Sequence, residues 1–259
     1  MPLPLMDIFL ALPAYALVVF RISGLVVTAP LYGSSAIPIR VRAAFTMVIA
    51  AMIFPAIKHQ APADLTLVTV VTAGVAEFMI GAIIGTSLTV LLMAAQVAGT
   101  LVGQQAGLAF SQVVDPLTDL RTSVLAQVYA VIATLLFLMI GGHRAAMAAL
   151  LDTYRAVPLL SFQPGESVVL LMIEVLTGAF IAGIRVAGPV IIALFLTETA
   201  VGFLSRTMPQ LNIMSVGFTI RLFVALAVAA LSITASEGIL TDVIWSGLET
   251  VRESFGMDS

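Results

Sequence analysis

The chain has 259 residues, of which 61% are hydrophobic and only 10% are charged, and its formal net charge is −3. Soluble domains carry about 25% charged residues, so this composition indicates an integral membrane protein or a subunit of a largely apolar assembly. A nucleic-acid-binding protein needs a basic patch, which 11 basic against 14 acidic residues do not favour.

Sequence motifs of common enzymes are missing. The chain has no cysteine, which excludes disulfides, thiolate nucleophiles and cysteine-based metal sites. A nucleotide-binding P-loop needs a Gly-Lys pair, whereas the sole lysine, Lys58, follows Ile57. The two histidines, His59 and His143, lie far apart, and neither a His-Glu-x-x-His motif nor a Gly-x-Ser-x-Gly elbow occurs. We therefore expect no enzymatic activity, no metal and no cofactor.

Charges, prolines and glycines divide the hydrophobic sequence into segments. The predicted helices span residues 6–29, 43–57, 65–102, 122–155, 167–205 and 219–249. Breaks are expected where proline or glycine interrupts the pattern, for example at Pro30, Pro62, Gly141-Gly142 and Pro164-Gly165. Several segments are shorter than the about 20 residues that cross a bilayer. We expect an all-α fold made of integral-membrane-type helical hairpins with broken helices.

Ionisable residues lie inside or beside the apolar stretches. They are Arg21, Glu77, Glu174, Arg185 and Glu198. An ionisable group at mid-bilayer costs at least about 2.5–3.5 kcal/mol, so many of these helices are expected to face protein or water. Alternatively, Arg21 and Arg185 mark helix ends and snorkel to the interface. Glu77 could pair with Arg21, with Arg185 or with a partner chain, and such a pair would specify assembly register rather than add stability.

The longest uncharged run covers residues 78–114 and is not a plain hydrocarbon surface. Its glycines recur at four-residue helical spacing, at Gly81, Gly85, Gly99, Gly103 and Gly107. Such a bare stripe lets another helix approach closely. The same run carries amides, which a lipid-facing helix does not use because unpaired buried polar groups are costly. Gln104 and Gln105 could pair across subunits or line a lumen, and the sequence does not decide between these.

Six local patterns follow one another along the chain. They are RISGLVVTAP (21–30), IPIRVR (37–42), EFMIGAIIG (77–85), GQQAGLAF (103–110) with Asp-Pro at 115–116, AGIRVAGP (182–189) and RTMPQLNIMSVGFTIR (206–221). In this order and spacing they resemble the family of the flagellar export-gate protein FliR over nearly the whole chain. The injectisome homologue SctT of virulence type III secretion is a close cousin, and the Gly-Gln-Gln-x-Gly-Leu pattern with Asp-Pro favours the flagellar branch.

The resemblance implies a non-enzymatic helical subunit of an export gate. One copy would assemble with several copies of two smaller hydrophobic proteins, FliP and FliQ, into a gated conduit for unfolded export substrates. The conduit would cross the bacterial cytoplasmic membrane at the flagellar basal body. The family fold implies a FliP-like part at residues 1–165 and a FliQ-like helical hairpin with a C-terminal tail at residues 166–259.

Family members have a loop between two long helices that closes the channel as a plug, and the matching loop lies near residues 107–120. The resemblance assigns to it Gly107, Leu108, Phe110, Val113, Val114, Asp115 and Pro116. Phe110 would seal by apolar contact and dewetting, Gly107 permits a turn, and Pro116 stops the helix from continuing. The alternative is a plain interhelical turn with Phe110 in the core.

The resemblance also places the tip of the FliQ-like hairpin on the cytoplasmic side, where the family meets the export-platform subunit FlhB. The matching residues are Arg206, Pro209, Gln210, Asn212 and Arg221. Arg206 and Arg221 could instead be ordinary cytoplasmic anchors.

Two other functional classes stay open from the residues alone. A self-contained secondary transporter or channel also has broken helices and intramembrane charges, although matched half-repeats are not found here. A membrane scaffold without a conduit is the third reading.

Overall fold

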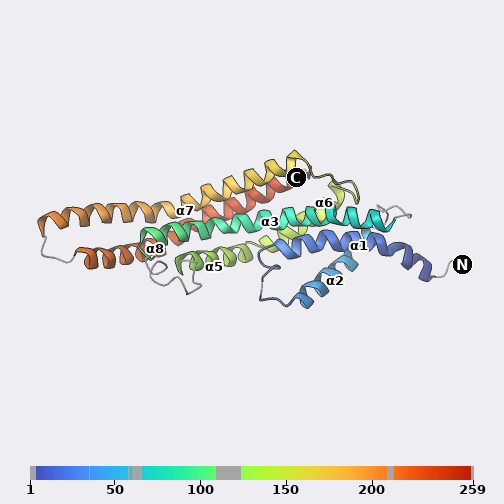
Figure 1. Ribbon diagram of the computed structural model, residues 1–259, viewed down its shortest axis with the longest axis horizontal. Coiled ribbons are helices and arrows are strands. Elements are labelled where there is room, and N and C mark those ends of the chain that lie inside the picture. The colour runs from blue at the N-terminus through green and yellow to red at the C-terminus, as the bar shows by residue number, and fades with distance from the viewer. Residues whose placement is uncertain are drawn as a thin grey trace. The chain divides into compact units, whose positions relative to one another are not determined.

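A computed structural model of the chain describes residues 4–34, 36–57, 59, 66–108, 124–208 and 213–257. The regular structure of these segments is helical, as the sequence predicts (Figure 1). The helices are α1 (Pro4–Thr28), α2 (Ile39–Ile57), α3 (Leu67–Gln105), α5 (Val124–Met139), α6 (Gly142–Ala156), α7 (Glu166–Thr207) and α8 (Ile213–Ser254). The expectation of an all-α fold is confirmed.

The predicted helix boundaries need three corrections. The helix predicted over 122–155 is divided at the expected glycine pair, because Gly141 has φ 75° and ψ 22°, a left-handed backbone that glycine adopts without a Cβ clash. The second helix begins at Ile39 rather than at residue 43, directly after Pro38, since proline is favourable at a helix start. The last helix begins at Ile213 rather than at residue 219.

Several helices are long and apolar enough to cross a membrane. By length and composition the candidates are Ala11–Thr28, Ile39–Ile57, Val68–Gln105 and Glu166–Thr207. Two bent pairs pass the same test only if each pair is one span, namely α5 with α6 and Val216–Ser232 with Ser236–Ser254. Such segments are typical of an all-α membrane protein with interrupted helices.

The chain forms two compact units. Unit 1 comprises Met1–Val90, Gly141–Leu176 and Trp245–Ser259, and unit 2 comprises Leu91–Ile140 and Thr177–Ile244. Long helices contribute one part to each unit, so the units are not consecutive blocks of sequence. The division into a FliP-like part and a FliQ-like hairpin at residue 165 therefore stays a prediction about family likeness.

In unit 1, α1 and the first half of α3 approach through facing glycines. A Cβ added at Gly24 would overlap the carbonyl oxygen of Phe78, and one added at Gly81 would overlap the carbonyl oxygen of Arg21. A Cβ at Gly85 would overlap Thr28 Oγ1. Backbone touches backbone here, so the glycines set the separation of the two helices.

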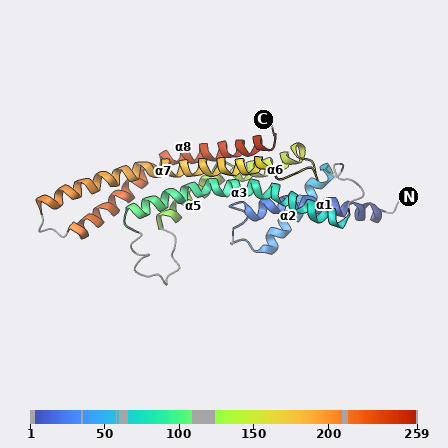
Figure 2. The ribbon, with the colours of Figure 1, turned by 45° about the horizontal axis from the view of Figure 1, so that its top comes forward.

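Helix α2 lies beside α1 in both views of the ribbon (Figures 1 and 2). Tyr15 joins them, because its hydroxyl donates to the carbonyl oxygen of Met47 (2.8 Å) and its ring meets the edge of Phe54 (centroids 5.7 Å apart). Thr46, Ala50 and Ile57 are the buried residues of α2. The other side chains of this apolar helix are partly or fully exposed, which is typical of a surface that faces lipid or another chain.

In unit 2, the second half of α3 contacts both α5 and α7. A Cβ at Gly99 would lie 2.5 Å from Ala126 Cα on α5, and one at Gly183 of α7 would lie 2.9 Å from the carbonyl oxygen of Ala94. Residues 177–207 of α7 run beside the first part of α8 (Figures 1 and 2). Small residues therefore determine close helix approach in this unit too.

Candidate functional site

An ion pair lies in the interior of unit 1, between α1 and α3. Arg21 Nε donates to Glu77 Oε2 at 2.5 Å, and the two side chains are 0% and 1% exposed. Of the alternatives that the sequence leaves open for Glu77, the structure shows the pair with Arg21. Arg21 does not snorkel to an interface, and Arg185 is exposed on α7.

Helix α6 completes the surroundings of the buried guanidinium. Arg21 Nη1 donates to Thr153 Oγ1 at 3.2 Å, and the Arg21 guanidinium carbon lies 4.3 Å from the centre of the Tyr154 ring. Tyr154 in turn donates its hydroxyl to the carbonyl oxygen of Val18 on α1 (3.4 Å). Arginine suits this place because its flat guanidinium stacks on an aromatic face while its edge donates several hydrogen bonds.

The ion pair also binds the segment between α6 and α7. Arg21 Nη1 donates to the carbonyl oxygen of Val157 (3.0 Å), and the backbone N–H of Leu160 donates to Glu77 Oε1 (3.0 Å). One arginine and one glutamate thus connect α1, α3, α6 and the segment that leads into α7. Among the described residues no acceptor lies within hydrogen-bond distance of Arg21 Nη2.

Sequence reasoning missed three members of this cluster. Thr153 and Tyr154 occupy one turn of α6. No sequence motif marks a threonine and a tyrosine that contact a buried arginine. Leu160 takes part through its backbone, and nothing about a leucine indicates that its N–H binds a carboxylate. The one available signal was Glu77 itself, an acid within an apolar stretch, which must find donors if it is buried.

Unit 2 exposes its amides. A groove of about 420 Å³ is lined by Gln96 of α3 and by α5, namely Gln127, Ala130, Val131, Thr134 and Leu135. Gln104 and Gln105, just over two turns further along α3, are also exposed, whereas Gly103 is buried. Exposed amides on an otherwise apolar helix are available to another subunit or to water.

The C-terminal end of α3 leads into the segment assigned to the plug. Gly107 has φ 83°. Its N–H donates to the carbonyl oxygen of Gln104 (3.0 Å), and the N–H of Leu108 donates to the carbonyl oxygen of Gly103 (3.0 Å). These are the two hydrogen bonds of a Schellman motif, so Gly107 ends the helix. The Phe218 ring of α8 lies against Gly107. Phe110, Val113, Val114, Asp115 and Pro116 fall outside the described residues.

The hairpin-tip residues are only partly described. Arg206 is exposed in the last turn of α7, and Arg221 of α8 pairs with Glu198 of α7 (3.3 Å), with side chains 37% and 32% exposed. Arg221 therefore faces α7 rather than the tip. Pro209, Gln210 and Asn212 lie outside the described residues. In the part of the chain that the structure describes, no group of three or more His, Asp or Glu residues could hold a metal.

Comparison with known proteins supports the resemblance drawn from the six patterns. A sequence model of the bacterial export proteins, family 1, matches residues 12–246. The flagellar biosynthetic protein FliR of Escherichia coli K12 is 30% identical over 210 residues, which cover 81% of this chain and 80% of that protein. Its namesake in Bacillus subtilis is 25% identical over 251 residues, which cover 96% and 95%. The surface presentation of antigens protein SpaR of Shigella sonnei is 29% identical over 150 residues, 58% of each chain.

Proposed function

Because this chain belongs to the bacterial export proteins, family 1, we propose that it is the FliR-type core subunit of a flagellar type III export gate in the cytoplasmic membrane. The observation that carries the proposal is the match over residues 12–246, supported by relatives named FliR that cover most of the chain. The match includes the buried pair Arg21–Glu77 and most residues of both compact units.

The surface of the chain fits a subunit that is completed by others. Apolar side chains are widely exposed, on α2 at Ile39 and Met52 and on α7 at Phe195 and Phe203. In unit 2 the amides of Gln96 and Gln127 are also exposed and line a groove. We propose FliP and FliQ as the partners that cover these faces, since small hydrophobic helical proteins would bury apolar area and pair with the amides.

The gate itself is proposed to be the segment that follows Gly107. The Schellman motif there turns the chain away from the axis of α3, so the residues that follow can project from the helix end. Phe110→Ala would weaken an apolar seal, and we expect increased ion leakage through the assembled complex, measured in cells or in vesicles. Leakage equal to that of the unmodified complex would contradict the plug assignment.

The turn between α7 and α8 is proposed to contact the export platform through FlhB. Arg206, exposed beside this turn, is available for such a contact, while Arg221 is engaged with Glu198. We expect Arg206→Glu to weaken recovery of FlhB more than Arg221→Glu does.

An injectisome subunit is the second candidate. The observation that favours it is the similarity to SpaR, over 58% of each chain. The physical role would be the same, a non-enzymatic subunit of a conduit, but the machine and its partners would differ.

Co-purification tests the proposal. The C-terminus is tagged in the native cell, the complex is extracted in mild detergent, and the proteins recovered are identified by mass spectrometry. Recovery of FliP and FliQ in excess over this chain is the expected result. Injectisome counterparts would favour the second candidate. Recovery of this chain alone, or as a simple homodimer, would contradict the export-gate proposal and favour a self-contained transporter.

A further inference from the structure

The segment between α6 and α7 contains a turn that its sequence does not favour. The N–H and Oγ of Ser161 both donate to the carbonyl oxygen of Pro158 (3.2 and 2.7 Å), closing a four-residue turn. Leu160 occupies the third position with φ 71°, as in a type II turn, where glycine or asparagine is usual. A leucine there brings its Cβ against the backbone, so the conformation is strained. Among the described residues other than glycine, only Leu160 has a positive φ.

The buried ion pair holds this turn at two points. Glu77 Oε1 accepts the hydrogen bond from Leu160 N–H, and Arg21 Nη1 donates to the carbonyl oxygen of Val157, the residue before the turn. Hydrogen bonds to ionised groups are the stronger kind. Strained backbone persists only where its surroundings over-determine it. We propose that Glu77 is a positioning residue whose carboxylate keeps Leu160 in the left-handed conformation and so fixes the segment from which α7 starts.

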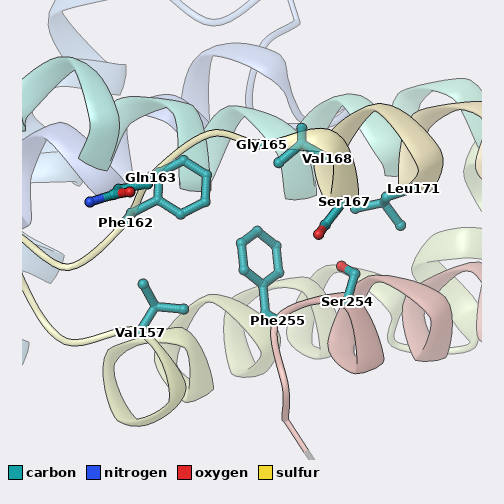
Figure 3. A pocket seen from close by; sticks show the side chains of 9 residues that line it. All are labelled: Val157, Phe162, Gln163, Gly165, Ser167, Val168, Leu171, Ser254 and Phe255. Atoms are coloured by element: carbon teal, nitrogen blue, oxygen red, sulfur yellow. The ribbon is translucent and has the colours of Figure 1, made fainter.

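The segment that contains the turn forms part of the wall of a small cavity. With the turn in place, Leu159 is 5% exposed, and the ring of Phe162 lies 6.3 Å from that of Phe255, which follows α8. The two rings point toward each other at the edge of a cavity of about 200 Å³, and the hydroxyls of Ser167 and Ser254 face it (Figure 3). Release of Leu160 would let the segment lift, expose Leu159 and separate the rings. We call residues 157–165, which Arg21 and Glu77 hold in place, the latch. This proposal does not depend on which export machine contains the chain.

The competing explanation is that Glu77 only neutralises Arg21. Charge and hydrogen-bond acceptor can be separated by substitution. Arg21→Met with Glu77→Met removes both charges and also the acceptor for Leu160. Arg21→Met with Glu77→Gln removes both charges but keeps an Oε1 that can accept the Leu160 N–H. Adding Leu160→Gly to the methionine pair removes the strain that the acceptor opposed, because glycine adopts a positive φ freely.

Cysteine labelling of the full chain in its native membrane reports on the latch. The chain has no native cysteine, so Leu159→Cys gives a single buried thiol whose reaction rate with a maleimide measures lifting of the segment. We expect the methionine pair to label at least about tenfold faster than the parent, as release of a strained backbone residue would allow. The Met/Gln pair, and the methionine pair with Leu160→Gly, should label at nearly the parent rate. An exposed control thiol outside the segment, at Glu249→Cys on α8, should label equally in all variants.

Two results would overturn the proposal. In one, the methionine pair labels no faster than the parent; in the other, Leu160→Gly fails to restore slow labelling. If the paired variants do not accumulate, the native pair is kept and Leu160 alone is changed. Leu160→Val, which tolerates a positive φ less well, should then label faster than Leu160→Gly. Equal labelling of these two variants would contradict a strained latch just as directly.

Discussion

The two compact units differ in their interiors: unit 1 buries an ion pair, although its second pair, Arg252–Asp152, is exposed to about the same extent as the pair of unit 2. In unit 1, Arg21 and Glu77 are buried and meet each other, an aromatic ring and backbone groups of the same chain. In unit 2, the ion pair Arg221–Glu198 is about one-third exposed, and Gln96 and Gln127 line an open groove. Buried polar groups must be satisfied, whereas exposed ones are free to bind others. Unit 1 therefore satisfies most polar atoms of its buried pair from the same chain, with Arg21 Nη2 as the exception among the described residues, and unit 2 presents polar groups that partners can complete.

Close glycine contact should give the largest effect. Gly81→Ala would bring a Cβ into the carbonyl oxygen of Arg21, and because both groups belong to helix backbones, α1 and α3 must separate. We expect a loss in unfolding free energy above the about 1–3 kcal/mol of ordinary overpacking, seen as failure of the protein to accumulate in membranes. Gly238→Ala is the matched control, since no atom lies within 4 Å of the added Cβ. Equal accumulation of both variants would refute the close contact.

The buried pair Arg21–Glu77 and the more exposed pair Arg221–Glu198 should differ in what they contribute to stability. Arg21→Met leaves a buried carboxylate without its partner, for which about 3–5 kcal/mol of stability is expected to be lost. Arg221→Met breaks a half-exposed pair and should cost less than about 1 kcal/mol. Thermal denaturation of the purified protein in detergent measures both. Similar losses for the two variants would remove the distinction between the units.

The amide groove should matter little for this chain alone. Gln127→Leu changes an exposed side chain, and surface substitutions of this kind usually lie within about 0.5 kcal/mol. Recovery of partner subunits with the tagged chain is expected to decrease while its thermal stability stays unchanged. A large loss of stability without a change in partners would mean that Gln127 supports the unit itself.

Much of the fold follows from the sequence. Glycine and proline located several breaks, as at Gly141, where a left-handed backbone divides the helix predicted over 122–155. The break expected at Pro55 was wrong, because α2 continues through this proline to Ile57. Glu77 within an apolar run indicated a buried pair, and Arg21 was among the partners expected. Both depend on local chemistry that a sequence displays directly. The predicted starts of helices were less accurate. The second helix was expected to begin after Arg42, whereas α2 begins at Ile39, because Pro38 favours a helix start there.

The features that the sequence did not predict depend on tertiary contacts. Tyr154 and Thr153 surround Arg21 only because α6 packs on α1, and no local pattern encodes that distance. Leu160 adopts a conformation opposed to its own preference, held by a residue far away in sequence. The proposed role of Gln127 would depend on partner surfaces that this chain does not contain. Such features appear where global packing overrides local propensity.

The most direct test of the account is a photo-crosslink from position 127 of the full chain in the native cell. A photoreactive amino acid replaces Gln127, which lines the groove of unit 2, and crosslinked proteins are identified by mass spectrometry. The account predicts crosslinks to FliP or FliQ that disappear in cells lacking those subunits. Persistent crosslinking to lipid alone, with the assembled gate present, would contradict the claim that unit 2 is completed by partner subunits.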